Sequence, residues 1–84
     1  MPYIKGFDRV PYDKGLDVIT EIKTKGDLEY CIFKLMKLYM KNKEMTYTEL
    51  HNCTYAAMHC ADEFRRRFLD SRENEAMSKN GDIK

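Results

Sequence analysis

Apolar residues recur every three or four positions along most of this chain, the spacing of helices that bury one side. The clearest case is the segment 27–42, where the following residues keep the 3.6-residue period of a helix: Leu28, Cys31, Ile32, Leu35, Leu38 and Tyr39. Other apolar residues widen this stripe well beyond one side, and the polar line consists of Lys34, Lys37 and Lys41. We therefore predict an all-α protein in which Asp27 caps this helix.

The amino-terminal residues 1–11, MPYIKGFDRVP, mix aromatic and aliphatic side chains with Gly and two Pro. This composition predicts an extended arm rather than a helix. We expect the arm to pack Tyr3, Ile4 and Phe7 against another surface.

A short helix is predicted over residues 13–24, between the arm and the helix at 27–42. Its apolar residues recur on one side: Leu16, Ile19 and Ile22. Gly26 would end this helix by adopting a left-handed conformation.

The third predicted helix covers residues 47–78 and has the clearest start in the sequence. Thr46 and Glu49 form a capping box, in which a hydroxyl and a carboxylate satisfy free backbone N–H groups. Asn80 and Gly81 end the helix, so residues 79–84 form a tail of a single helical domain, 1–84. About 30 helical residues make a rod of about 45 Å, which is long for so small a chain.

Small and apolar side chains cover an arc of about 200° on this long helix, roughly twice the usual amphipathic stripe. One line of them contains Cys53, Ala56, Ala57, Cys60 and Phe64. A neighbouring line contains Leu50, Thr54, Met58, Ala61 and Phe68. The arc indicates either one thick internal core or self-association, and we favour a homo-oligomer because one partner helix covers only part of the arc.

Composition narrows the possible partners. The chain has 84 residues, with 15 basic and 14 acidic side chains and a net charge of +1. That balance argues against general DNA or RNA binding, which needs a strong basic excess, but it permits one small anionic ligand. No apolar run is as long as a membrane span and no signal-peptide pattern is present, so we expect no membrane partner. Three Cys without a secretory pattern predict reduced thiols in the cytoplasm.

Metal binding and catalysis find little support. The obvious metal candidates are His51, Cys53, His59 and Cys60. However, the two Cys lie about 10 Å apart along a helix, too far to share one zinc ion or one disulfide. We therefore interpret the thiols as small core residues and expect no metal and no cofactor. No local spacing builds a nucleophile–base pair, so we do not expect an enzyme.

The run Arg65–Arg67 is the strongest candidate for anion binding. Asp62 and Glu63 stand four residues before Arg66 and Arg67, the favourable order for ion pairs on a solvated surface, whereas Arg65 has no such partner. A free guanidinium matches a phosphate in a bidentate geometry. Four tyrosines could stack on a base, although ordinary core packing is as good an interpretation for each alone: Tyr3, Tyr30, Tyr47 and Tyr55.

Five short motifs, MPYI, GDLEY, TYTEL, EFRRR and NGD, follow one another along the chain. In this order they resemble a widespread family of very small phage proteins, which includes viral nucleotide sponges of the anti-CBASS protein 4 type. The resemblance covers most of the chain. It implies an oligomeric helical protein of the host cytoplasm that sequesters a cyclic nucleotide immune signal without cleaving it.

The resemblance also implies binding positions, which are Pro2, Tyr3, Ile4, Tyr30, Tyr47, Arg65, Arg66, Asn80, Gly81 and Asp82. Glu29 and His51 stand where relatives often carry Asn, and the chain ends in Ile83-Lys84 rather than in an aromatic residue. An amide replaced by carboxylate or imidazole changes the donors and acceptors offered to a ligand. His51 is therefore included among the candidate ligand-binding residues.

We expect a phage immune-evasion protein that binds a cyclic oligonucleotide, such as a cyclic dinucleotide. The candidate ligand-binding residues are Tyr3, Ile4, Tyr30, Tyr47, His51, Arg65 and Arg66. The alternative is a small helical interaction module that docks its apolar surface on a host protein and inhibits it. A structural component of the virion is a third possibility.

Overall fold

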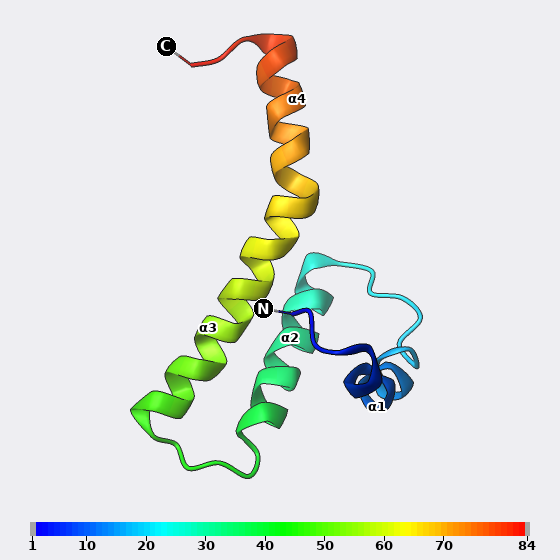
Figure 1. The fold of residues 1–84 in the computed structure, drawn as a ribbon, viewed down its shortest axis with the longest axis vertical. Helices are drawn as coiled ribbons and strands as arrows, with labels where there is room; N and C mark the ends of the chain where they lie inside the picture. Colours follow the sequence, from blue (N-terminus) through cyan, green and yellow to red (C-terminus); the bar gives the residue numbers. More distant parts are fainter. Residues whose placement is uncertain (1, 84) are drawn as a thin grey trace.

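The computed structural model describes residues 2–83, and all regular structure in that range is helical (Figure 1). The predicted all-α class is thus confirmed. The elements in chain order are α1 (Gly6–Leu16), α2 (Lys25–Met40), α3 (Tyr47–Phe64), the π-helical segment η1 (Arg65–Leu69) and α4 (Asp70–Asn80). Met1 of the predicted arm and Lys84 of the predicted tail lie outside the described residues.

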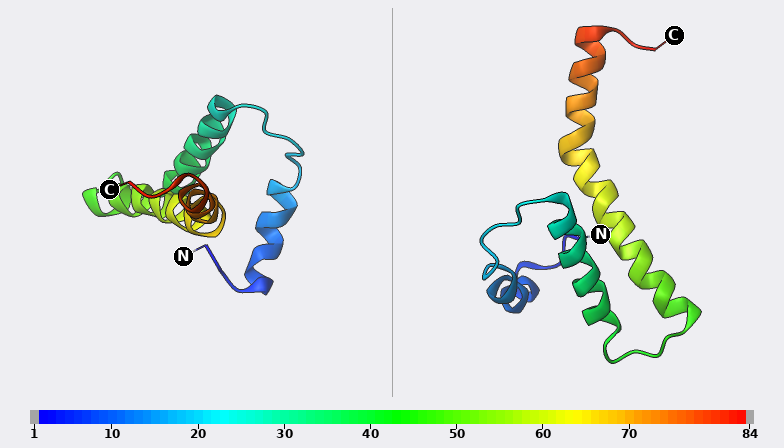
Figure 2. Two further views of the ribbon diagram at one scale, coloured as in Figure 1. Left: turned by 90° about the horizontal axis from the view of Figure 1, so that it is seen from above. Right: turned by 180° about the vertical axis from the view of Figure 1, so that it is seen from behind.

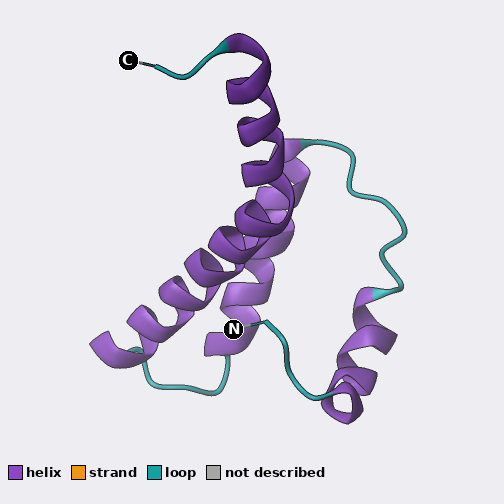
Figure 3. Cartoon of the chain, turned by 45° about the horizontal axis from the view of Figure 1, so that its top comes forward, coloured by secondary structure: helices purple, strands orange, loops and turns teal. Residues whose placement is uncertain are grey.

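The first helix lies earlier than the sequence pattern predicts. α1 begins at Gly6 and contains Pro11, whereas the segment 17–24 is a turn followed by loop (Figure 3). The prediction of an arm over 1–11 and a helix over 13–24 was therefore wrong at both boundaries. Pro11 lies in the interior of α1, where it lacks the N–H of one helical hydrogen bond and its ring crowds the preceding turn, so it weakens this helix. The three consecutive β-branched residues at 18–20 disfavour a helix over this segment, because such side chains lose χ1 freedom against the preceding helical turn.

The start of α2 is set by Thr24 rather than by Asp27. The Thr24 hydroxyl accepts a hydrogen bond from the backbone N–H of Asp27 at 3.0 Å, so Thr24 is the N-cap and Asp27 lies in the first turn. Gly26 is also inside this turn and ends no helix. The acidic side chain of Asp27 still stabilises the helix, because the amino-terminal end of a helix carries partial positive charge.

Helices α2 and α3 form an antiparallel hairpin that contains the small core. Met40 and Cys53 are its two buried residues among those described. The Cys53 thiol lies 3.6 Å from the backbone carbonyl oxygen of Met36, and the Tyr39 hydroxyl donates to the Glu49 carboxylate at 3.2 Å. These contacts fix the register of the hairpin, in which Cys53 on α3 faces α2.

The helical rod from Tyr47 to Asn80 matches the predicted third helix of residues 47–78, including its start. The Thr46 hydroxyl accepts from the N–H of Glu49 at 3.2 Å, which confirms half of the predicted capping box, whereas the Glu49 carboxylate accepts from the Tyr39 hydroxyl instead. Gly81 ends the rod with φ of 90°, a backbone conformation that residues with a Cβ rarely adopt. The sequence did not predict the π-helical segment, where the N–H of Asp70 bonds the carbonyl of Arg65, five residues back.

The molecule is open rather than globular. Among residues 2–83, α4 contacts no element other than η1 and extends beyond the hairpin, and α1 lies to one side of α2 at the end of a long loop (Figures 1 and 2). The principal extents are 50 × 32 × 29 Å. Within residues 2–83, no helix combines the length and the apolar composition needed to cross a membrane.

Candidate functional site

The short arm, residues 2–5 in the structure, meets the carboxyl-terminal end of α3 through Tyr3. The Tyr3 hydroxyl donates to Oε1 of Glu63 at 3.4 Å and accepts from Nη1 of Arg67 at 3.2 Å. The Arg67 guanidinium also lies 6.0 Å from the centre of the Tyr3 ring. One tyrosine thus joins two segments that are 60 or more residues apart in the sequence, and it does so beside the arginine run.

Glu63 is the centre of this cluster. Its carboxylate accepts from Nε of Arg66 at 2.8 Å and also from Nη2 of the same guanidinium. The side chain of Glu63 is only 18% exposed. The Arg66 hydrogen bond lowers the pKa of the Glu63 carboxyl, partial loss of hydration opposes this, and the Tyr3 hydroxyl adds to the lowering. The same ion pair raises the pKa of Arg66.

The ion pairs of the arginine run differ from those expected from sequence spacing. Arg65 pairs with Asp62 at 3.2 Å, three residues back, so the prediction that its guanidinium has no helical partner was wrong. Arg66 pairs with Glu63 rather than with Asp62, which leaves Arg67 to contact Tyr3. Residues three apart are neighbours on a helix as much as residues four apart, and the π-helical segment begins at Arg65.

Tyr47 and His51 lie at the other end of α3 and belong to an aromatic ladder. Ring centres are 4.1 Å apart for Tyr47 and His51, 5.0 Å for His51 and Tyr55, and 6.2 Å for Tyr55 and His59. The 18 residues from Tyr47 to Arg65 correspond to about 27 Å along the helix axis. One chain therefore does not bring this ladder and the arginine run to the same small ligand.

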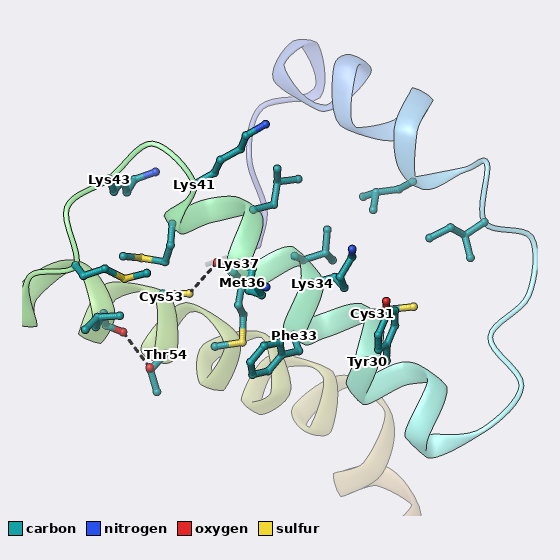
Figure 4. Close-up of a pocket in the computed structure, with 17 residues that line it drawn as sticks. Tyr30, Cys31, Phe33, Lys34, Met36, Lys37, Lys41, Lys43, Cys53 and Thr54 are labelled. Carbon is teal, nitrogen blue, oxygen red and sulfur yellow. Dashed lines mark hydrogen bonds between the residues drawn. The ribbon is translucent and has the colours of Figure 1, made fainter.

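Tyr30 lines an apolar groove of about 980 Å³ that lies between α1, its following loop and the α2–α3 hairpin (Figure 4). Lysines line part of this groove: Lys34, Lys37, Lys41 and Lys43. Ile4 lies in the arm, where its backbone carbonyl accepts from Nε of Arg9 at 2.7 Å. The candidate residues thus fall into three places: the Tyr3 cluster, the aromatic ladder and the groove.

The thiols and imidazoles are separated in the structure. Cys53 is buried, Cys31 is half-buried and Cys60 is exposed, so the interpretation of all three as core residues was wrong for Cys60. In the described part of the chain, no group of three or more His, Cys, Asp or Glu side chains is placed to hold a metal ion.

Sequence reasoning missed Glu63 and Arg67 as members of the candidate site. Both were read as partners of each other on a solvated surface. The available signal was the aromatic residue of the arm, which needs a polar partner for its hydroxyl once it packs against a helix. The contacts of Tyr3 with Glu63 and Arg67 join residues at least 60 positions apart in the sequence, so they depend on how the chain folds the arm against α3. The periodic spacing of residues along a helix gives no information on such long-range contacts.

The fold and this site define a class: a small all-helical protein with an open hairpin, a long carboxyl-terminal rod and a tyrosine-linked arginine run. Residues 1–83 match the model of a family described as Domain of unknown function (DUF6899), and the chain belongs to this family. Searches of curated proteins and of solved structures returned no match to the chain.

Proposed function

We propose that this protein binds and sequesters a cyclic nucleotide signal without cleaving it, as a phage immune-evasion protein acting in the host cytoplasm. The observation that supports this proposal is the position of the arginine run beside Tyr3, with Arg67 3.2 Å from its hydroxyl. Guanidinium groups bind phosphates, and a neighbouring aromatic ring offers a surface for a base. The resemblance to viral nucleotide sponges agrees with this chemistry.

The ion pairs at the site are compatible with exchange for a phosphate. The side chains of Arg65 and Asp62 are 58% and 61% exposed, and such surface pairs contribute little to stability. A phosphate can therefore replace the Asp62 carboxylate at Arg65 at small cost. Arg66 is held more firmly by Glu63, so we assign the main phosphate contacts to Arg65 and Arg67.

The aromatic ladder at Tyr47 and His51 could contact the same ligand as the arginine run only if it belonged to a second copy of the chain. Tyr47 and Arg65 lie on the same angular side of α3, 18 residues apart. An antiparallel α3 of a neighbouring copy would set the start of one helix beside the arginine run of the other. The base would then stack on Tyr47 or Tyr3, so full affinity would require a homo-oligomer.

Isothermal titration calorimetry with a panel of cyclic dinucleotides and trinucleotides tests this function. Arg67→Ala should weaken binding of the preferred compound by about 1.5–3 kcal/mol, the scale of hydrogen bonds to charged groups. Arg72→Ala is the matched control, because Arg72 lies one turn further along the rod and pairs with Glu75 instead. Bound nucleotide should be recovered unchanged after heat denaturation. No heat with any compound, or equal losses in both variants, would contradict the proposal.

The alternative, a module that docks on a host protein and inhibits it, is favoured by one observation. Apolar side chains are exposed along the whole chain, including Phe33, Leu38 and Phe64. Where such side chains form a contiguous patch, the patch commonly marks a protein interface. A docking module would retain its partner protein in a pull-down and release no nucleotide on denaturation, which separates the two functions.

A further inference from the structure

Helix α2 is apolar on almost every side, yet only one side of it is covered. Ten of its 16 residues are apolar or aromatic, and Met36 and Met40 face α3. A helix that is hydrophobic all round belongs inside a larger core. Leu28, Leu35 and Leu38 of this helix remain 46%, 49% and 63% exposed. The uncovered side of α2 therefore requires a partner.

The spacing of the three leucines and of the half-buried Cys31 specifies what kind of partner fits. Leu28, Cys31, Leu35 and Leu38 follow one another at intervals of three, four and three, the a/d pattern of a coiled-coil seam. We call these four residues the seam. Cys31, Leu35 and Leu38 line the groove, with Leu16 and Ile19 on its far side. An α-helix presenting the same pattern fits such a surface.

The exposed area indicates that the partner covers much more than a few side chains. The chain exposes 8049 Å². A folded monomer of 10.0 kDa exposes about 5,200 Å², so each chain exceeds the expected area by roughly 2,800 Å². Two chains together therefore exceed the expected area by about 5,600 Å², whereas permanent dimers bury about 2,000–5,000 Å² in total between their two chains. A second copy of the chain thus accounts for a large part of the missing burial.

We propose that the seam of α2 packs against the seam of α2 in a second copy, antiparallel and about a two-fold axis. Leu28 would then lie opposite Leu38 of the second copy, and Cys31 opposite its Leu35. Charge selects this direction, because α2 carries Asp27 near its start and Lys41 just after its end. Antiparallel packing sets the acidic end of each helix beside the basic end of the other.

The remaining lysines are compatible with this arrangement. Lys34 lies close to the two-fold axis, where its alkyl stem extends along the seam and its ammonium group reaches solvent. Figure 4 shows Lys34 and Lys41 on the groove side of α2, next to the apolar surface that the second helix would cover. This interface involves neither the arginine run nor Tyr3, so it stands independently of the proposed ligand.

Light scattering coupled to size exclusion tests the interface. The wild-type chain should have at least twice the mass of the 10.0 kDa monomer, and Leu35→Glu should reduce that mass at least twofold. Met77→Glu is the control, because Met77 is exposed to a similar extent, 44%, and lies on α4 outside the seam. A monomeric wild type would overturn the proposal and leave the groove to α1 of the same chain or to a different protein. An unchanged mass of Leu35→Glu would overturn it as well.

Cysteine cross-linking tests the direction of packing without destabilising the core. In a Cys60→Ala background, Leu35→Cys should form a covalent dimer under mild oxidation, because residue 35 faces Cys31 of the second copy. Cys60→Ala alone should stay uncoupled, since antiparallel packing keeps the two Cys31 residues too far apart for a disulfide. A covalent dimer of Cys60→Ala alone would indicate parallel helices. Failure of the Leu35→Cys variant to cross-link would also overturn the proposed register.

Discussion

At the scale of single residues, Glu63 links the arm to the rod. Its carboxylate accepts hydrogen bonds from Arg66 and from Tyr3, and Arg67 completes the cluster by donating to the same tyrosine. The sequence indicated that the arginines would have acidic neighbours, but helical spacing alone assigned the wrong pairs. Local side-chain geometry decided between partners three and four residues away.

The depressed pKa of Glu63 makes a pH-dependent contribution to stability. Because the folded pKa lies below the ordinary value of 4.5, the stabilisation is fully present above about pH 4.5 and is lost as pH falls through the folded pKa. In urea denaturation, wild type should therefore exceed Glu63→Gln near neutral pH, and the difference should shrink on acidification. An NMR titration of Arg66→Gln should show the Glu63 pKa returning toward 4.5. A difference between wild type and Glu63→Gln that does not vary with pH would contradict this prediction.

At the scale of elements, hydroxyl caps set the starts of α2 and α3. Thr24 and Thr46 each accept from the backbone N–H three residues later, at 3.0 and 3.2 Å. Such caps satisfy N–H groups that no helical carbonyl reaches. The cap at Thr46 was recognised from the sequence, whereas the cap of α2 was predicted at Asp27 instead of Thr24. α1 lacked a signal of this kind, since its N-cap Lys5 makes no side-chain cap bond, and its boundaries were mispredicted.

Thr46→Ala should lower the free energy of unfolding by about 1 kcal/mol, the usual cost of removing a hydroxyl N-cap. Thr48→Ala is the control, because Thr48 is exposed inside the first turn of α3, where alanine is the better helix former. Urea denaturation followed by circular dichroism measures both. Equal effects of the two substitutions would show that the loss came from something other than the cap.

The π-helical segment is an element that no local pattern predicted. It adds one residue to the turn at Arg65–Leu69, so every side chain of α4 is rotated relative to a continuous α-helix. Such segments are frequent at functional sites, and this one contains the whole arginine run. The extended arc predicted for residues 47–78 therefore holds along α3 but changes direction at Arg65.

At the scale of the whole molecule, the chain is more open than a compact domain of its length. Its radius of gyration is 16.6 Å, whereas a compact domain of 84 residues has about 12 Å. Met40 and Cys53 alone are buried among the described residues. Folding and association are therefore expected to be coupled.

Coupled folding makes the melting temperature depend on protein concentration. For a dimer of this size, a tenfold increase in concentration should raise it by roughly 3–5 °C, given the usual entropy of unfolding per residue. Leu35→Glu should melt at a lower temperature that no longer varies with concentration. Differential scanning calorimetry over a hundredfold range measures this. A wild-type melting temperature that is independent of concentration would contradict the coupling.

The sequence by itself determined the helical class, the presence of α2, the extent of the long rod and the cap at Thr46, because these depend on periodicity and on neighbours within four residues. It also indicated more apolar surface than one short chain can bury. Only the tertiary structure decided that Tyr3 meets Glu63 and Arg67, that Arg65 pairs with Asp62, and that the seam of α2 stays uncovered. These features depend on which segments far apart in the sequence come into contact and on which side of a helix is covered by its neighbour. The spacing of residues along the chain specifies neither the contacts nor the covered side.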